Sequence, residues 1–151
     1  AHVLEMQGRL AEGAAWLTPP ANGWADRNAM KGHLWWHSTL FPLEQGRYER
    51  VLELYDRAVR PGEKPFYLDL QNAAALLARL EFRGIDVGDR WHELAAHCRV
   101  RTEDHAILFT DLHNALALGR AGETAAARDL VASLERFAER TITRPVSSAG
   151  W

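Results

Sequence analysis

The sequence predicts an all-α fold, a right-handed solenoid of about seven to eight helices that pair into hairpins. One observation is a repeat, because Gly8, Gly46, Gly84 and Gly122 are each 38 residues apart. Each glycine closes an apolar, helix-forming stretch, and glycine at that place is a helix C-cap signal because it adopts positive φ without steric cost. The other observation is that no segment shows the sustained period-two alternation of a strand.

The elements of this fold follow in order from the spacing of apolar residues and from the turn residues between them. Proline and glycine mark loops at residues 18–23 and 60–65. We expect a helical repeat domain over residues 1–140 and a C-terminal tail over 141–151. The helices are predicted at residues 1–7, 10–17, 27–45, 47–60, 67–83, 89–100, 103–120 and 123–139.

The second repeat is the clearest of the four. A bulky residue opens its first helix, glycine and tyrosine lie at the turn, and aromatic and small residues alternate along its second helix; these are Trp35, Gly46, Tyr48, Tyr55 and Ala58. The spacing is that of a tetratricopeptide-type hairpin, in which small residues let the two helices approach closely. The predicted solenoid is therefore tetratricopeptide-like.

Composition excludes several classes of protein. The chain has 151 residues, 47% hydrophobic and 25% charged, with a formal net charge of -2. This balance excludes a disordered chain and argues against nucleic acid or an anionic membrane as the partner. The single cysteine, Cys98, excludes an internal disulfide. No apolar run is long enough to span a bilayer and no secretory leader is evident, so we expect a cytoplasmic protein.

Two histidines on one predicted helix form the first candidate site. His33 and His37 are four residues apart, which places both imidazoles on one helix face with the spacing of two metal ligands. The glutamate of a zinc-hydrolase HExxH motif is missing. The simpler interpretation is that these histidines line a groove or form a hydrogen bond with a neighbouring residue. The sequence therefore assigns no metal and no cofactor.

The repeat register adds a second pair of candidates, Asp111 and His113. His113 lies nine residues before Gly122, as His37 lies nine before Gly46. In a solenoid the first helices of the repeats line the concave face, which is the usual ligand surface. Asp111 is either a solvent-facing residue or a carboxylate aimed at a neighbouring imidazole, and in the second case His37, Asp111 and His113 could serve as an acid–base or metal-binding group.

Tryptophan is abundant, with six residues in the chain. Indole rings anchor ligands well because they offer a large apolar area and one hydrogen-bond donor. Trp35 and Trp36 point about 100° apart on a helix, so they cannot both be buried against the same neighbour. By register, Trp36 is expected to reach toward the groove beside His33 and His37.

Together these elements resemble a known family of helical-repeat proteins. The resemblance rests on six segments that cover nearly the whole chain: residues 1–9, the His33-x-Trp35-Trp36-His37 element, Leu43-Glu44-x-Gly46-x-Tyr48, Leu54-Tyr55-Asp56, Val87-Gly88-Asp89-Arg90-Trp91 and Asp111-Leu112-His113. They are similar to the tetratricopeptide repeat protein 38 family. The resemblance implies a portion of a longer all-helical protein, a recurrent constellation of His33, Trp35, Trp36, His37, Asp111 and His113, and no settled catalytic activity.

Two functional interpretations follow from the sequence. The favoured one is a binding or scaffold module whose concave groove, lined by histidine and tryptophan, holds a peptide, a partner protein or a small ligand. The alternative is an enzyme or small-molecule pocket that uses His37, Asp111 and His113. Because only seven residues precede Gly8, we also expect a segment of a longer array, completed by a missing N-terminal segment or by self-association.

Overall fold

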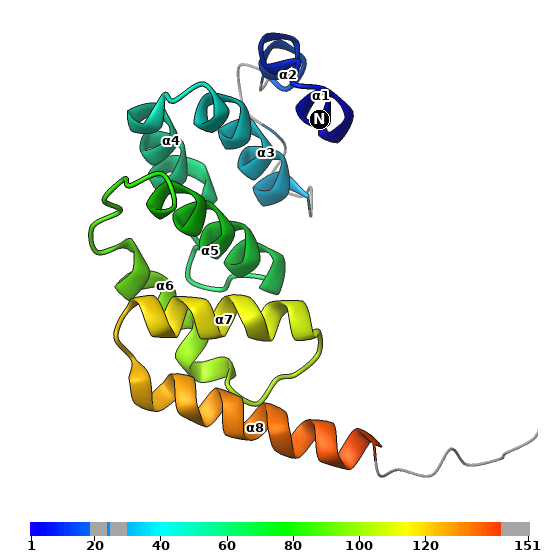
Figure 1. Ribbon diagram of the computed structural model, residues 1–151, viewed down its shortest axis with the longest axis vertical. Coiled ribbons are helices and arrows are strands. Elements are labelled where there is room, and N and C mark those ends of the chain that lie inside the picture. The colour runs from blue at the N-terminus through cyan, green and yellow to red at the C-terminus, as the bar shows by residue number, and fades with distance from the viewer. Residues whose placement is uncertain (19–23, 25–29, 143–151) are drawn as a thin grey trace, which may run out of the picture.

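The computed structural model describes residues 1–18, 24 and 30–142, and all regular structure in these residues is helical. The prediction of an all-α fold is confirmed. The α4 helix continues into a π-helical turn, Tyr55–Val59, and α6 continues into a 3-10 turn, Arg99–Arg101. The α-helices of the described residues are α1 (His2–Met6), α2 (Leu10–Trp16), α3 (Lys31–Glu44), α4 (Tyr48–Leu54), α5 (Tyr67–Glu81), α6 (Arg90–Cys98), α7 (Leu108–Arg120) and α8 (Thr124–Ile142) (Figure 1).

Two predicted boundaries are wrong. The helix predicted to begin at residue 103 begins at Leu108, because His105 adopts a φ of 38°, a left-handed conformation that interrupts a right-handed helix. The helix predicted at residues 123–139 continues to Ile142. The remainder of the predicted tail, the start of the helix predicted at 27–45 and most of the loop predicted at 18–23 lie outside the described residues.

The four repeat glycines end their helices in the same way. Each has positive φ, at 68°, 70°, 76° and 74° in chain order. In every case the backbone N–H of the residue after the glycine donates to the carbonyl oxygen five residues earlier, and the donors are Arg9, Arg47, Ile85 and Glu123. This is the Schellman motif, in which glycine accommodates the left-handed residue that closes the helix. The predicted role of the glycines as helix ends is confirmed.

The first helices of successive hairpins lie side by side. Helix α5 packs against α3 on one side and against α7 on the other, and α6 packs against both α5 and α7 (Figure 1). Three polar contacts join α3 to α5 or α5 to α7, and a fourth joins α3 to the turn after α5. The partners of each are 39 residues apart: His33 with Asn72, Gln71 with Thr110, Glu81 with Arg120 and, at the turn, Glu44 with Arg83. The same separation therefore recurs at both ends of the helices.

The core lies between the hairpins. Its largest fully buried side chains include Tyr55, Leu43, Leu77 and Leu118, and Trp35 and Trp91 belong to the same continuous cluster. Burial of these apolar surfaces provides the main favourable free energy for packing one hairpin on the next. Within the described residues, no helix combines the length and apolar character that crossing a membrane requires.

The N-terminal hairpin is attached to the rest of the molecule mainly through α2, which packs on α3 while α1 packs on α2. Gly13 lies at this contact. A Cβ atom at Gly13 would be 2.1 Å from Cε1 of Phe41, a side chain that is 1% exposed. The absence of a side chain at Gly13 thus lets the α2 backbone rest directly on the Phe41 ring, and this contact sets the position of α1.

Candidate functional site

Helix α3 and helix α1 together form the candidate site. The four-residue spacing of His33 and His37 places both imidazoles on one face of α3, and their Nε2 atoms are 3.1 Å apart. Nδ1 of His33 lies 3.2 Å from Oδ1 of Asn72, which belongs to α5. The ring of Trp36 stacks on His33 with centroids 5.4 Å apart and an interplanar angle of 14°. Neighbours on two helices thus hold the His33 ring in place.

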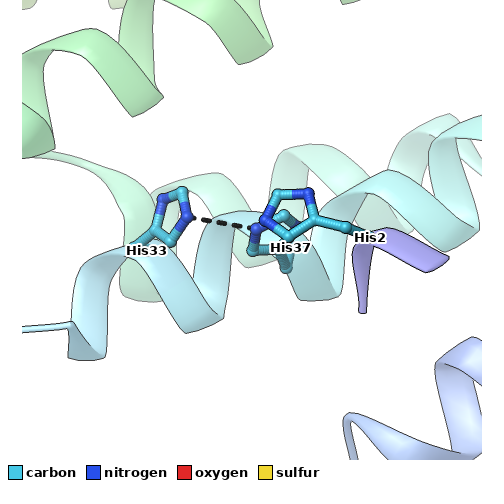
Figure 2. Close-up of side chains that lie close together, drawn as sticks. All are labelled: His2, His33 and His37. Carbon is cyan, nitrogen blue, oxygen red and sulfur yellow. Dashed lines mark hydrogen bonds between the residues drawn. The ribbon is translucent and has the colours of Figure 1, made fainter. Parts of the chain in front are cut away.

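A third histidine, from α1, joins this pair. One ring nitrogen of each of His2, His33 and His37 lies within 4.8 Å of the others. The three side chains lie close together (Figure 2). His2 is exposed and His37 is buried at 3% exposure. The His2 ring meets the His37 ring edge on, with centroids 4.3 Å apart. Sequence reasoning did not select His2 as a candidate, because only packing of the N-terminal hairpin brings it to His37.

A pocket of about 590 Å³ opens beside this histidine cluster, between α1, α3 and α5. Trp36 lines it from α3, and the guanidinium of Arg79, on α5, lies 5.5 Å from the centroid of its ring. Such a cation–π contact holds the indole in place while leaving part of it available to a ligand. The lining residues are His2, Glu5, Met6, Gly8, Leu10, Trp36, Glu44 and Arg79.

The neighbouring tryptophan has a different environment. Trp35 is 6% exposed and packs edge to face against Trp24, with ring centroids 4.7 Å apart. The guanidinium of Arg57 lies 5.3 Å from its ring centroid. Trp35 therefore belongs to the packing between hairpins, while Trp36 faces the pocket.

Asp111 contacts a histidine that the sequence did not single out. Its Oδ1 lies 3.2 Å from Nδ1 of His105, and Nε2 of His105 lies 2.8 Å from Oγ of Ser133. All three side chains are buried, at 3%, 7% and 5% exposure for Asp111, His105 and Ser133. This chain of hydrogen bonds fastens the loop before α7 to α7 and α8. Its order resembles that of a hydrolase triad, and all three side chains are buried in this structure.

The structure does not bring His113 to either of its predicted partners. Nδ1 of His113 lies 2.7 Å from the carbonyl oxygen of Phe109, one turn earlier in α7, and its ring contacts the Phe109 ring. His37 belongs to α3 and His113 to α7, and α5 packs between these helices. The residues of the predicted group, His37, Asp111 and His113, therefore each contact different neighbours and do not come together.

The environment of His37 predicts a dependence of stability on pH. Burial, together with the neighbouring imidazoles of His33 and His2, lowers the pKa of His37 from its usual value near 6.5 to about 4. In the unfolded chain His37 takes up a proton near pH 6.5, whereas in the folded protein it stays neutral to about pH 4. Its contribution to the free energy of unfolding should therefore decline as the pH falls between these values.

Urea denaturation of chelator-treated protein at several pH values between 6.5 and 4 measures this change in the free energy of unfolding. His37→Leu removes the titrating group, so the difference in unfolding free energy between wild type and variant should change over pH 6.5 to 4. The facing groups His33, His2 and Glu5 remain in both proteins. A difference that stays constant with pH would contradict the prediction.

No protein-family model matches the chain, and no solved structure matches it.

Proposed function

We propose that this chain is a helical-repeat binding module that holds a peptide segment of a partner protein on the surface formed by α1, α3, α5 and α7. The proposal includes a tetratricopeptide-like solenoid with a right-handed superhelix. Its support is the repeat itself: glycines 38 residues apart, the same helix-ending motif at each, and polar contacts 39 residues apart between adjacent first helices. Stacked hairpins of this kind present an extended surface to a ligand.

The pocket at Trp36 is the observation that carries the binding function. An aromatic ring that lines a pocket, with polar and charged groups around it, is typical of anchor sites for peptide side chains. Trp36, with Met6 and Leu10 of the N-terminal hairpin, provides the apolar part of this pocket. We expect an apolar or aromatic side chain of the peptide to occupy it.

The surface continues on α7. Leu112 lies ten residues before Gly122, as Trp36 lies ten before Gly46, so the two side chains hold the same place in their repeats. Leu112 is 59% exposed, and Leu108 and Leu116, one turn away on either side, are also exposed. Apolar side chains that share one exposed helix face are typical of protein-binding surfaces. A peptide that extends from the Trp36 pocket across α5 would reach these leucines.

The enzymatic alternative has less support. The acid–base group on which it depended is divided, since Asp111 hydrogen-bonds His105 and α5 separates His37 from His113. Cys98 is buried, and burial raises the pKa of its thiol to about 12, which leaves it unreactive. The resemblance to the tetratricopeptide repeat protein 38 family, which brings no settled catalytic activity, agrees with a binding role and remains part of the proposal.

The binding function is tested by selecting a peptide ligand and then replacing Trp36, the residue expected to anchor it. Peptides are selected from a random linear library on immobilised wild-type protein, and the best one is titrated by calorimetry. Trp36→Ala should weaken binding at least roughly tenfold, because a buried aromatic anchor provides a large share of binding free energy. Helicity, followed by circular dichroism, should not change, since Trp36 is only half-buried.

Trp16→Ala is the matched control. Trp16 lies at the end of α2, is 67% exposed and does not line the pocket. Its loss should leave peptide affinity unchanged. If Trp36→Ala binds the selected peptide as tightly as wild type does, or if both variants lose affinity equally, the groove has been assigned to the wrong face.

A further inference from the structure

Three imidazoles converge where α1 meets α3, and their arrangement has the features of a metal-binding site. One nitrogen from each of His2, His33 and His37 lies within 4.8 Å of the others, and the Nε2 atoms of His33 and His37 are 3.1 Å apart. Two nitrogen ligands at the usual zinc distance of about 2.1 Å, in tetrahedral geometry, are separated by roughly 3.4 Å. The α3 pair is thus spaced for a shared ion without movement of the helix.

The hydrogen bond to Asn72 prepares His33 for this role. Because an amide oxygen accepts, Nδ1–H of His33 donates to Oδ1 of Asn72, and Nε2 of His33 is left with a lone pair that faces His37. Histidines that bind metals usually donate their other ring N–H to an acceptor in this way, which fixes both tautomer and ring orientation. Stacking of Trp36 on the same ring adds a second restraint.

His37 has a buried nitrogen that the protein does not satisfy. If Nε2–H of His37 donates to His33, its Nδ1 carries a buried lone pair without a hydrogen-bond partner. If the proton is on Nδ1, that N–H is unpartnered and the two Nε2 lone pairs face each other at 3.1 Å. Both tautomers are unfavourable in the metal-free protein. When the proton of His37 is on Nδ1, an ion bound by both Nε2 atoms would remove the repulsion between their lone pairs.

The donor set indicates which ions fit. Neutral imidazole suits zinc, copper and nickel, whereas magnesium and calcium prefer oxygen ligands. Oε2 of Glu5 lies 4.0 Å from Nδ1 of His37 and is a nearby source of negative charge. His2 and Glu5 also line the pocket, so an ion here would border the space open to a ligand.

We infer that His2, His33 and His37 form a binding site for a divalent transition-metal ion, with Zn²⁺ as the expected occupant, and that the ion fastens α1 to α3. Helix α1 has only five residues and packs chiefly on α2. A helix of this length is not stable alone, so a bond between His2 and the α3 histidines would hold it in place. This inference concerns a metal site and does not depend on whether the groove binds a peptide.

The test uses Zn²⁺ alone with untagged, chelator-treated protein. Calorimetry should show one ion bound per chain. His2→Gln should weaken binding by more than the roughly 10- to 100-fold that loss of an outer-shell partner costs, since it removes a direct ligand. Because the His2 side chain is exposed, this variant should keep the wild-type circular dichroism spectrum. Zinc-edge X-ray absorption should show three imidazole nitrogens at about 2.0–2.1 Å in wild type.

His92→Gln is the matched control, because His92 is an exposed histidine on α6, remote in sequence from the cluster. It should bind Zn²⁺ with wild-type affinity. Zn²⁺ should also raise the melting temperature of wild type and of His92→Gln, but not that of His2→Gln, since binding to the folded state stabilises it. Equal Zn²⁺ affinity in wild type and in His33→Gln/His37→Gln would overturn the inference, as would equal losses in His2→Gln and His92→Gln.

Discussion

Replacing His105 with alanine is expected to lower the free energy of unfolding by about 3 kcal/mol. The substitution leaves the buried carboxylate of Asp111 and the buried hydroxyl of Ser133 without the ring that joins them. Oδ2 of Asp111 already lacks a hydrogen-bond partner, so the whole carboxylate would then be unsatisfied. Thermal denaturation should show a fall in melting temperature of roughly 10 °C for a chain of this size.

His113→Ala is the control for this prediction. His113 lies on the same helix as Asp111, but its ring bonds only the carbonyl oxygen of Phe109 and contacts the Phe109 side chain. Its loss should cost less than about 1 kcal/mol, as expected for a single partly exposed contact. Similar melting temperatures for His105→Ala and wild type would show that the buried network does not fasten the loop before α7.

Gly13→Ala is expected to release the N-terminal hairpin from α3. At an exposed helix position this change would gain about 1 kcal/mol of helix propensity. At Gly13 the new methyl group would instead lie 2.1 Å from the buried ring of Phe41, and overpacking of this kind costs about 1–3 kcal/mol. Because α2 carries most of the attachment of this hairpin, amide hydrogen exchange should accelerate over residues 2–16 and stay unchanged in α5 to α8.

Gly13→Ala should also change the cluster formed by His2, His33 and His37. Once α2 leaves Phe41, His2 no longer lies beside His33 and His37, so Zn²⁺ affinity should fall although all three ligands are present. Gly119→Ala is the matched control: Gly119 is also a helical glycine, but a Cβ atom there has nothing within 4 Å. It should leave both exchange and Zn²⁺ affinity unchanged. Unaltered exchange in α1 and α2 of Gly13→Ala would contradict the proposed anchoring contact.

Much of the fold follows from local sequence signals. The glycines predict the helix ends because each requires positive φ, and the apolar spacing predicts the helices because each buries one face. The start of α7 could not be predicted in this way. Residues 103–107 have no proline or glycine, and the left-handed residue, His105, contacts Asp111 and Ser133, which lie 6 and 28 residues further along the chain.

The candidate site was predictable only in part. The four-residue spacing of His33 and His37 indicates a shared helix face, and the repeat register places Trp36 toward a groove. The contribution of His2 depends on how α2 packs against Phe41, which no local pattern encodes. Register alone also suggested that equivalent residues such as His37 and His113 act together. In the structure they are on first helices two repeats apart, with α5 between them.

The proposed binding function places the ligand at Trp36, on the face formed by the first helices. The most direct measurement follows the indole N–H signals of the six tryptophans by ¹⁵N–¹H nuclear magnetic resonance, each assigned with a Trp→Phe variant, during titration with the selected peptide. Binding at Trp36 should shift the Trp36 signal, with saturation at one peptide per chain, while the Trp16 signal stays in place. A shift at Trp16 with no change at Trp36 would contradict this placement of the ligand.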